Sequence, residues 1–334
     1  MSKIEKTIAR QQEKIEEGQF YEAHQQLRVI ASRYVKQSNW SAATDILSSG
    51  AQLLLKAGQG GSGGDLGLYL IDVYTKSSRK PDAASKARVI SLMRGFPAGE
   101  PTRKRFINEA VAWTSRLGEF PAGDPEIHHV AGVLYADGVE DSLHQDTEDE
   151  PYDAEKHLIL GTKDSPETLS KLLYTWYTED EPSTAPFYAS RAVLPYLLIG
   201  NLRAANKSHL LFTSQLQSIP HLATQTVESK TSDLRIYPSL PLLNFLGLLL
   251  LAVQRGSPEL FRMLKSQYKT QLAEVPAWSE PLDQVGEMYF GIKIPSQGNP
   301  LMDMMSGMLM GGGGQPKKKP RTVGAAAPTA PGVD

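Results

Sequence analysis

MSKIEKTIARQQEKIEEGQFYEAHQQLRVIASRYVK, residues 1–36, is the stretch that decides the fold class of this chain. Ile4, Ile8 and Ile15 share one face of a helix at about 100° per residue. A second apolar series, at steps of three and four, follows Gly18 and consists of Phe20, Ala23, Leu27, Ile30, Ala31 and Tyr34. Because Gly18 lies between the two series, the stretch predicts a hairpin of two helices joined by a short turn.

The same helical spacing recurs through most of the chain. We expect further helices at residues 40–56, 66–75, 82–94, 102–117, 125–136, 240–254, 258–272 and 278–290, and others starting near residues 153, 165, 186 and 202. Many helix pairs with almost no strand signal predict an all-α fold. The natural architecture is an α-solenoid of stacked antiparallel helix pairs, similar to tetratricopeptide repeats in unit length, with the repeat consensus only loosely kept.

A glycine-rich stretch, GQGGSGGD (residues 58–65), interrupts two of the expected helices. It lacks the Lys-Ser/Thr pair that a phosphate-binding P-loop requires, so it predicts a flexible linker and no nucleotide site. The one strand signal lies in residues 221–240, where side chains alternate around a turn-like Ser229–Asp233. We therefore expect a small β-hairpin inserted around residues 222–238.

The composition changes near Ser296, which separates a tail from the helical part of the chain, and we divide the helical part into two halves near residue 160. Residues 1–160 form the N-terminal half of the solenoid, residues 161–295 its C-terminal half with the hairpin, and residues 296–334 a low-complexity tail. The tail is too poor in apolar bulk to offset chain entropy, so it is expected to be disordered. Its methionine-rich stretch (residues 302–310) fits a partner-binding segment or a capping helix, and PKKKPR (residues 316–321) fits a solubilising run or an import signal.

Composition excludes several classes of function. The chain has 334 residues, a formal net charge of −2 and no cysteine, which excludes disulfides, Cys-ligated metals and Cys nucleophiles. The near balance of charge argues against a nucleic-acid partner. The charged N-terminus is no secretory signal, and the apolar residues 240–253 are too few to span a membrane, so no membrane insertion is expected.

No catalytic, cofactor or metal site is predicted. His128, His129 and His157 fall in helices and His144 in a loop, and adjacent histidines on a helix point about 100° apart, which disfavours convergence on one metal ion. No G-x-S-x-G nucleophile motif is present. A non-enzymatic role is therefore expected.

Charge is sorted on the first expected helix. Lys3, Lys6, Arg10 and Lys14 fall within an arc of about 80°, away from the isoleucine face. A patch of one sign attracts an oppositely charged partner, and the alternative is a simply solvated helix face. Asp72, within the apolar LYLIDVY, is either a paired core carboxylate or an exposed group on a binding face.

The expected hairpin carries apolar residues on a candidate surface element. These are Val227, Leu234, Ile236 and Tyr237. A two-stranded ribbon is marginal by itself and presents unpaired edges. It either folds back onto the helices or serves as a docking element.

Seven segments, taken together and in this order, resemble the Golgi-to-ER traffic protein four family. They are EGQFYEAHQQLRVIASRY (17–34), GSGGDLGLYLIDVY (61–74), EIHHVAG (126–132), AEKHLILGT (154–162), SRAVLPYLLIGN (190–201), PLLNFLGLLLLAVQR (241–255) and GEMYFGI (286–292). The resemblance covers roughly residues 1–310.

The resemblance implies a cytosolic, non-enzymatic adaptor of the pathway that delivers tail-anchored membrane proteins to the ER. It implies that the N-terminal half binds the targeting ATPase, through Lys3, Lys6, Arg10, Lys14 and Asp72. It implies that the C-terminal half binds a ubiquitin-like partner subunit, through the hairpin residues Val227, Leu234, Ile236 and Tyr237. The alternative is a helical-repeat regulatory subunit of a protease-lid or translation-factor complex.

Overall fold

The computed structural model describes residues 3–293 except residues 98, 142–149, 218–221 and 230–231. The predicted tail, with its methionine-rich and basic stretches, and His144 lie outside the described residues. Helices dominate the part described. They are α1 (Lys3–Glu16), α2 (Phe20–Lys36), α3 (Trp40–Lys56), α4 (Gly60–Lys76), α5 (Ala83–Gly95), α6 (Pro101–Leu117), α7 (Pro125–Asp141), α8 (Glu150–Ile159), α9 (Ser165–Thr178), η1 (Pro182–Thr184), α10 (Ala185–Leu198), α11 (Leu202–Leu216), α12 (Pro241–Arg255), α13 (Pro258–Gln267), α14 (Lys269–Ala273), η2 (Pro276–Trp278) and α15 (Ser279–Phe290).

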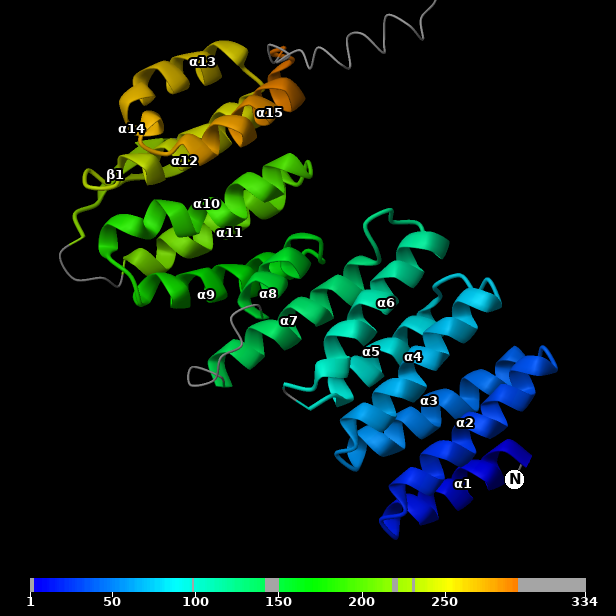
Figure 1. The fold of residues 1–334 in the computed structure, drawn as a ribbon. Coiled ribbons are helices and arrows are strands. Elements are labelled where there is room, and N and C mark those ends of the chain that lie inside the picture. The colour runs from blue at the N-terminus through cyan, green and yellow to red at the C-terminus, as the bar shows by residue number, and fades with distance from the viewer. Residues whose placement is uncertain (1–2, 98, 142–149, 218–221, 230–231, 294–334) are drawn as a thin grey trace, which may run out of the picture. The chain divides into compact units, whose positions relative to one another are not determined.

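The helices stack in two layers, which confirms the predicted all-α solenoid. In the first layer α1 packs on α3, α3 on α5, α5 on α7 and α7 on α9, while α2, α4 and α6 pack in turn in the second (Figure 1). Most successive helices also pack on each other across short turns, as in helical-repeat proteins. Each helix thereby buries its apolar stripe against several neighbours.

The first turns of the solenoid repeat one backbone geometry every twenty residues. Gly18, Ser38, Gly58 and Ser78 have positive φ angles of 80°, 55°, 74° and 52°. In each turn the next residue donates its N–H to a carbonyl five residues earlier: Gln19 to Lys14, Asn39 to Tyr34, Gln59 to Leu54 and Arg79 to Tyr74, at 2.8–2.9 Å. This bond ends each helix at a residue in the left-handed backbone conformation, which favours glycine.

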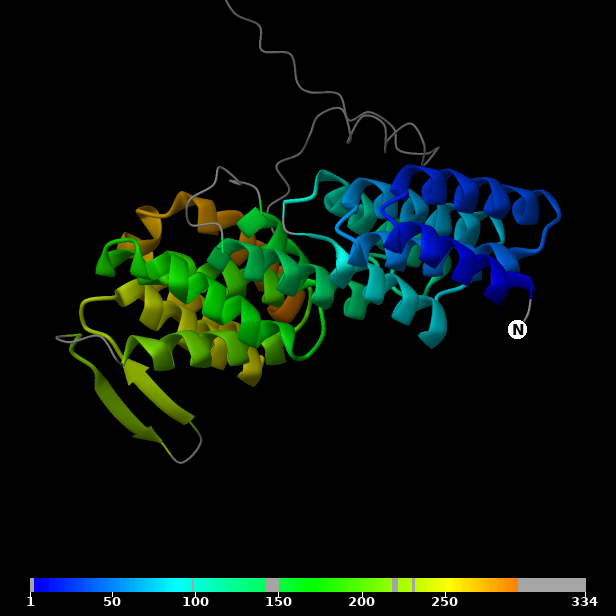
Figure 2. The same ribbon diagram turned by 90° about the horizontal axis from the view of Figure 1, so that it is seen from below.

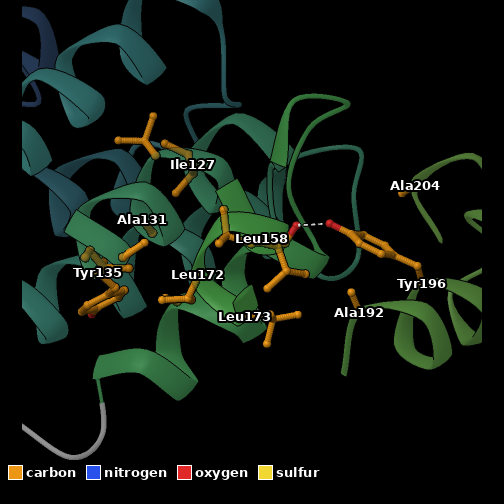
Figure 3. Packing of buried hydrophobic residues seen from close by; sticks show 14 of the residues in the cluster. Ile127, Ala131, Tyr135, Leu158, Leu172, Leu173, Ala192, Tyr196 and Ala204 are labelled. Carbon is orange, nitrogen blue, oxygen red and sulfur yellow. Dashed lines mark hydrogen bonds between the residues drawn. The ribbon is translucent and has the colours of Figure 1, made fainter. Parts of the chain in front are cut away.

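The apolar core continues without a break through the middle of the chain. Figure 3 shows Ile127 of α7, Leu158 of α8, Leu172 of α9 and Ala192 of α10 gathered around one junction. Tyr196 of α10 is 1% exposed, and its hydroxyl donates a hydrogen bond to the Leu158 carbonyl at 3.0 Å. The bond satisfies the one polar atom of a ring that otherwise fills the core, as a buried tyrosine requires.

The glycine-rich stretch forms the start of α4, so the prediction of a flexible linker there was wrong. Gly63 and Gly64 are buried because neighbouring helices approach α4 closely. A Cβ added at Gly64 would lie 2.5 Å from Thr102 Cγ2, and one at Gly63 would lie 2.7 Å from Leu55 Cγ. The glycines therefore admit α3 and α6, and the composition that resembled a linker reflects helix packing.

Replacing Gly64 with alanine should destabilise the fold by about 2 kcal/mol, because the added methyl group overpacks against Thr102. The matched control is Gly61→Ala in the same helix. A Cβ at Gly61 meets nothing within 4 Å, so this change should be neutral or stabilise by up to about 1 kcal/mol. Urea unfolding of both variants measures the difference. Equal effects would contradict the close-packing account.

The predicted hairpin is confirmed as β1 (Gln225–Ser229) paired antiparallel with β2 (Ser232–Ile236). It projects from the helices between α11 and α12 (Figure 2). The apolar stretch after it forms α12, which is buried along most of its length, as expected of a core helix. Among the described residues no helix is long and apolar enough to cross a lipid bilayer.

Candidate protein-binding surfaces

The basic residues of α1 lie on its solvent face. Ile15 and Gln11 are buried, and Ile4 and Ile8 pack against the core, which turns the opposite face outward. Lys3, Lys6 and Arg10 are exposed and Lys14 is half-buried. None of these four cations forms an ion pair with another described residue, so their charge is free to act on a partner. We call these four residues the basic stripe.

A second charged cluster joins α2 to α4. Asp65 of α4 accepts hydrogen bonds from His24 Nε2 at 2.9 Å and from Arg28 Nη1. The Arg28 guanidinium lies 5.6 Å from the centre of the Tyr69 ring, a cation–π contact. Partial burial acts to raise the pKa of Asp65, but the bonds from Arg28 and His24 outweigh it and hold that pKa below its ordinary value. Asp65 is therefore a firmly ionised anchor on this face.

Asp72 belongs to the same face and is no core carboxylate. Its side chain is 44% exposed and accepts a hydrogen bond from Lys76 at 2.6 Å, one turn along α4. On a helix, Asp72 stands two turns from Asp65 and falls on the same side. The structure thus resolves the two alternatives for Asp72 in favour of the surface, and its predicted contact with an ATPase stays a prediction.

Sequence reasoning missed the centre of this face. His24 and Arg28 are one turn apart on α2, and Tyr21, which is 71% exposed, lies on the same side of that helix. Asp65 went unrecognised because it ended the stretch interpreted as a linker. The signal that was available is the spacing of Asp65, Tyr69 and Asp72 at steps of four and three. We call the residues Tyr21, His24, Arg28, Asp65, Tyr69 and Asp72 the α2–α4 face.

The hairpin is fixed to the helices at its base. Tyr237, directly after β2, donates its N–H to Asn244 Oδ1 and accepts from Asn244 Nδ2, both at 2.8 Å. Its hydroxyl donates to the Thr213 carbonyl of α11 at 3.1 Å. Burial of this ring raises the pKa of Tyr237. Asn244, a polar residue within the apolar residues 240–253, is explained by these bonds, because it supplies both partners that the buried backbone of Tyr237 needs.

The four predicted hairpin residues therefore have different settings. Tyr237 is 1% exposed, so in this chain its side chain holds the hairpin and does not face solvent. Ile236 is half-buried. Val227 and Leu234 pair directly opposite each other in the ladder. Their contact with a ubiquitin-like subunit stays a prediction.

Two of the histidines form a buried pair between α7 and α8. His128 Nδ1 and His157 Nδ1 are 2.8 Å apart, and His128 Nε2 lies 3.0 Å from the Ala122 carbonyl. Because Nε2 must donate to that carbonyl, the neutral His128 accepts at Nδ1 and His157 donates. Burial, together with the neighbouring His128, lowers the pKa of His157 to about 4. Among the described residues no group of three or more histidine and acidic side chains converges as metal ligands would.

Acidification should destabilise the fold through this pair. A histidine whose pKa is lowered in the folded state binds its proton more readily when unfolded, so stability falls as pH drops from about 6.5 towards 4. For His157 the loss reaches about 3 kcal/mol at pH 4. Urea unfolding at pH 7.5 and at pH 5 should show it, and His157→Gln should lose at least part of the pH dependence. If the free energy of unfolding of His157→Gln depends on pH as steeply as that of the wild type, the histidine pair does not cause the dependence.

The chain is thus a helical-repeat protein with three surfaces suited to binding other proteins. They are the basic stripe, the α2–α4 face and the hairpin, which is fixed to the helices at its base. The profile of one family, Golgi to ER traffic protein 4, matches residues 37–309. The chain belongs to that family.

Individual relatives agree with this assignment. Golgi to ER traffic protein 4 of Aspergillus fumigatus is 56% identical over 94% of this chain and 92% of its own length. Its counterpart in Schizosaccharomyces pombe is 32% identical over 87% of this chain and 91% of its own. A solved structure titled "Crystal structure of C. therm. Get4" superposes with a TM-score of 0.82 at 50% identity, covering 96% of this chain and all of that one.

Proposed function

We propose that this chain is a non-enzymatic adaptor of the tail-anchored protein pathway. It bridges a targeting ATPase and a ubiquitin-like co-chaperone partner, and so promotes the handover of tail-anchored membrane proteins for insertion into the ER membrane. The observation that carries this proposal is membership of the Golgi to ER traffic protein 4 family over residues 37–309. The cytosol is the compartment in which such an adaptor would meet both partners.

The N-terminal half, residues 1–160, supplies the proposed ATPase surface. The basic stripe supports this role because its four cations have no internal partners among the described residues. The α2–α4 face supports it as well, since a fixed array of Arg28, Asp65 and Asp72 can pair with charges of either sign. Complementary charge of this kind speeds encounter and sets orientation more than it adds affinity.

The C-terminal half, residues 161–295, supplies the proposed surface for the ubiquitin-like subunit. The hairpin supports this role because it forms a two-stranded sheet held at one end by Tyr237 and Asn244. A ribbon held only at its base presents strand edges to which another chain can add. The hydrogen bonds of Tyr237 at the base, which we call the clip, would keep those edges in one orientation and so reduce the entropy lost on binding.

Bridging gives the function a physical mechanism that needs no chemistry in this chain. When one protein holds both the ATPase and the subunit that recruits client-loaded chaperones, client transfer becomes an intramolecular event at high effective concentration. If the chain also favours one ATPase conformation, it must bind that conformation more tightly than the other.

Purification of the tagged full-length chain from cytosol, followed by mass identification of bound proteins, tests the proposal. The wild type should bring down both partners. A variant with a reversed basic stripe should lose only the ATPase, and a variant without the hairpin only the ubiquitin-like subunit. Recovery of protease-lid or translation-factor subunits would favour the alternative function. Nucleotide hydrolysis by the purified chain itself would contradict a non-enzymatic role.

A further inference from the structure

A pocket of about 750 Å³ lies where α8, α9, η1 and α10 meet, apart from both proposed surfaces. Four aromatic side chains line it: Tyr152 from α8, Trp176 from α9, and Phe187 and Tyr188 from α10. Tyr152 is 61% exposed and Phe187 43% exposed, although large aromatic rings are normally among the first groups a fold buries. The fold thus leaves aromatic surface open around a hollow large enough for a side chain and the backbone that carries it.

Two of these rings already contact a cationic side chain of the same chain. The Arg191 guanidinium lies 5.2 Å from the centre of the Tyr152 ring and 5.4 Å from that of Trp176. Its charge is neutralised by Glu155, which accepts from Arg191 Nε at 3.0 Å and also from Nη2. Arg191 and Glu155 therefore fix the two rings in place without leaving a net positive charge in the pocket.

The rim of the pocket is acidic. Glu179 and Asp180 line it directly after α9. Asp180 accepts hydrogen bonds from the Tyr188 hydroxyl at 3.1 Å and from the Glu181 N–H at 2.8 Å. Neither Glu179 nor Asp180 forms an ion pair with a cation in the described part of the chain. The pocket thus combines exposed aromatic faces with two uncompensated carboxylates.

We infer that this pocket binds an extended, lysine- and proline-rich segment of a partner protein. Aromatic faces attract cations, and nearby carboxylates add to that attraction, so the pocket selects lysine or arginine and rejects acidic segments. Exposed aromatic rings also pack against proline rings in a polyproline II helix, an extended helix that is ordered before it binds. This site is independent of the ATPase and ubiquitin-like surfaces, so it adds a third contact to the adaptor.

Fluorescence anisotropy with the full-length chain and a fluorescein-labelled (Lys-Pro)4 peptide at low salt tests the inference. The peptide should bind saturably, and a (Glu-Pro)4 peptide should not. Glu179→Gln with Asp180→Asn should weaken binding of (Lys-Pro)4 about tenfold. Tyr152→Ala should weaken it about fivefold, and Tyr152→Phe, which keeps the ring, should restore it.

The matched control neutralises two adjacent exposed acids elsewhere, Glu16→Gln at the end of α1 with Glu17→Gln directly after it, and should change the affinity less than twofold. Thermal unfolding establishes that every variant is folded. If both pairs of neutralised acids weaken binding equally, the peptide responds only to overall charge and the inference fails. It fails also if (Lys-Pro)4 does not bind, or if Tyr152→Ala binds as the wild type does.

Discussion

Reversing Lys6, Arg10 and Lys14 to glutamate should weaken binding of the targeting ATPase at least about 100-fold. The three residues lie on the solvent face of α1 without ion pairs to other described residues, so the change alters a surface charge pattern and no internal contact. Each reversal replaces an attraction with a repulsion, and a total of about 3 kcal/mol corresponds to about a 100-fold change in affinity. Isothermal titration of the purified proteins measures it.

A control with the same change of net charge separates the stripe from general electrostatics. Arg105, Arg116 and Arg203 are exposed cations on α6 and α11, and their reversal should leave ATPase affinity within about threefold. The wild-type affinity should fall with rising salt. The stripe variant should lose most of that dependence, because it lacks the cations whose attraction to the ATPase is screened by salt. Equal affinity in the wild type and the stripe variant would remove the stripe from the interface.

The sequence was sufficient for the fold class because helical periodicity is a local signal. The face of Ile4, Ile8 and Ile15, and the break at Gly18, are visible without knowing any neighbour. The start of α4 was not predictable in this way. Gly63 and Gly64 are poor helix formers in isolation, and only the approach of Leu55 and Thr102 from other helices explains them.

The candidate surfaces divide along the same line. The basic stripe could be read from one helix, because its members share that helix and need no partner. The α2–α4 face could not, because Asp65 and Arg28 are 37 positions apart and meet only when α2 packs on α4. The pairing of His128 with His157 across α7 and α8 was hidden for the same reason. Tyr237 shows the opposite error, since its apolar character indicated a contact surface while its position made it the base of the hairpin.

Removing the hairpin should abolish the complex with the ubiquitin-like subunit. Residues 224–236 can be replaced by Gly-Gly, because Gln225 pairs with Ile236 and paired residues lie only about 5 Å apart. Tyr237 and Asn244 remain, so the contact between α11 and α12 is retained. Affinity should fall below detection in a pull-down, while the far-ultraviolet circular dichroism keeps its helical signal, since the deleted strands contribute none of it.

Tyr237→Phe distinguishes the orientation of the hairpin from its mere presence. The variant loses the hydroxyl bond to Thr213, which costs about 1 kcal/mol of stability. If the clip orients the hairpin, Tyr237→Phe should weaken binding of the ubiquitin-like subunit several-fold. The control is Tyr174→Phe, which loses a similar bond from a hydroxyl to the carbonyl of Gln215 on α11 and should bind normally. Binding that survives the deletion of residues 224–236 would assign the partner to another surface of the C-terminal half. Binding that is lost on deletion but unaffected by Tyr237→Phe would mean that the strands make the contact without help from the clip.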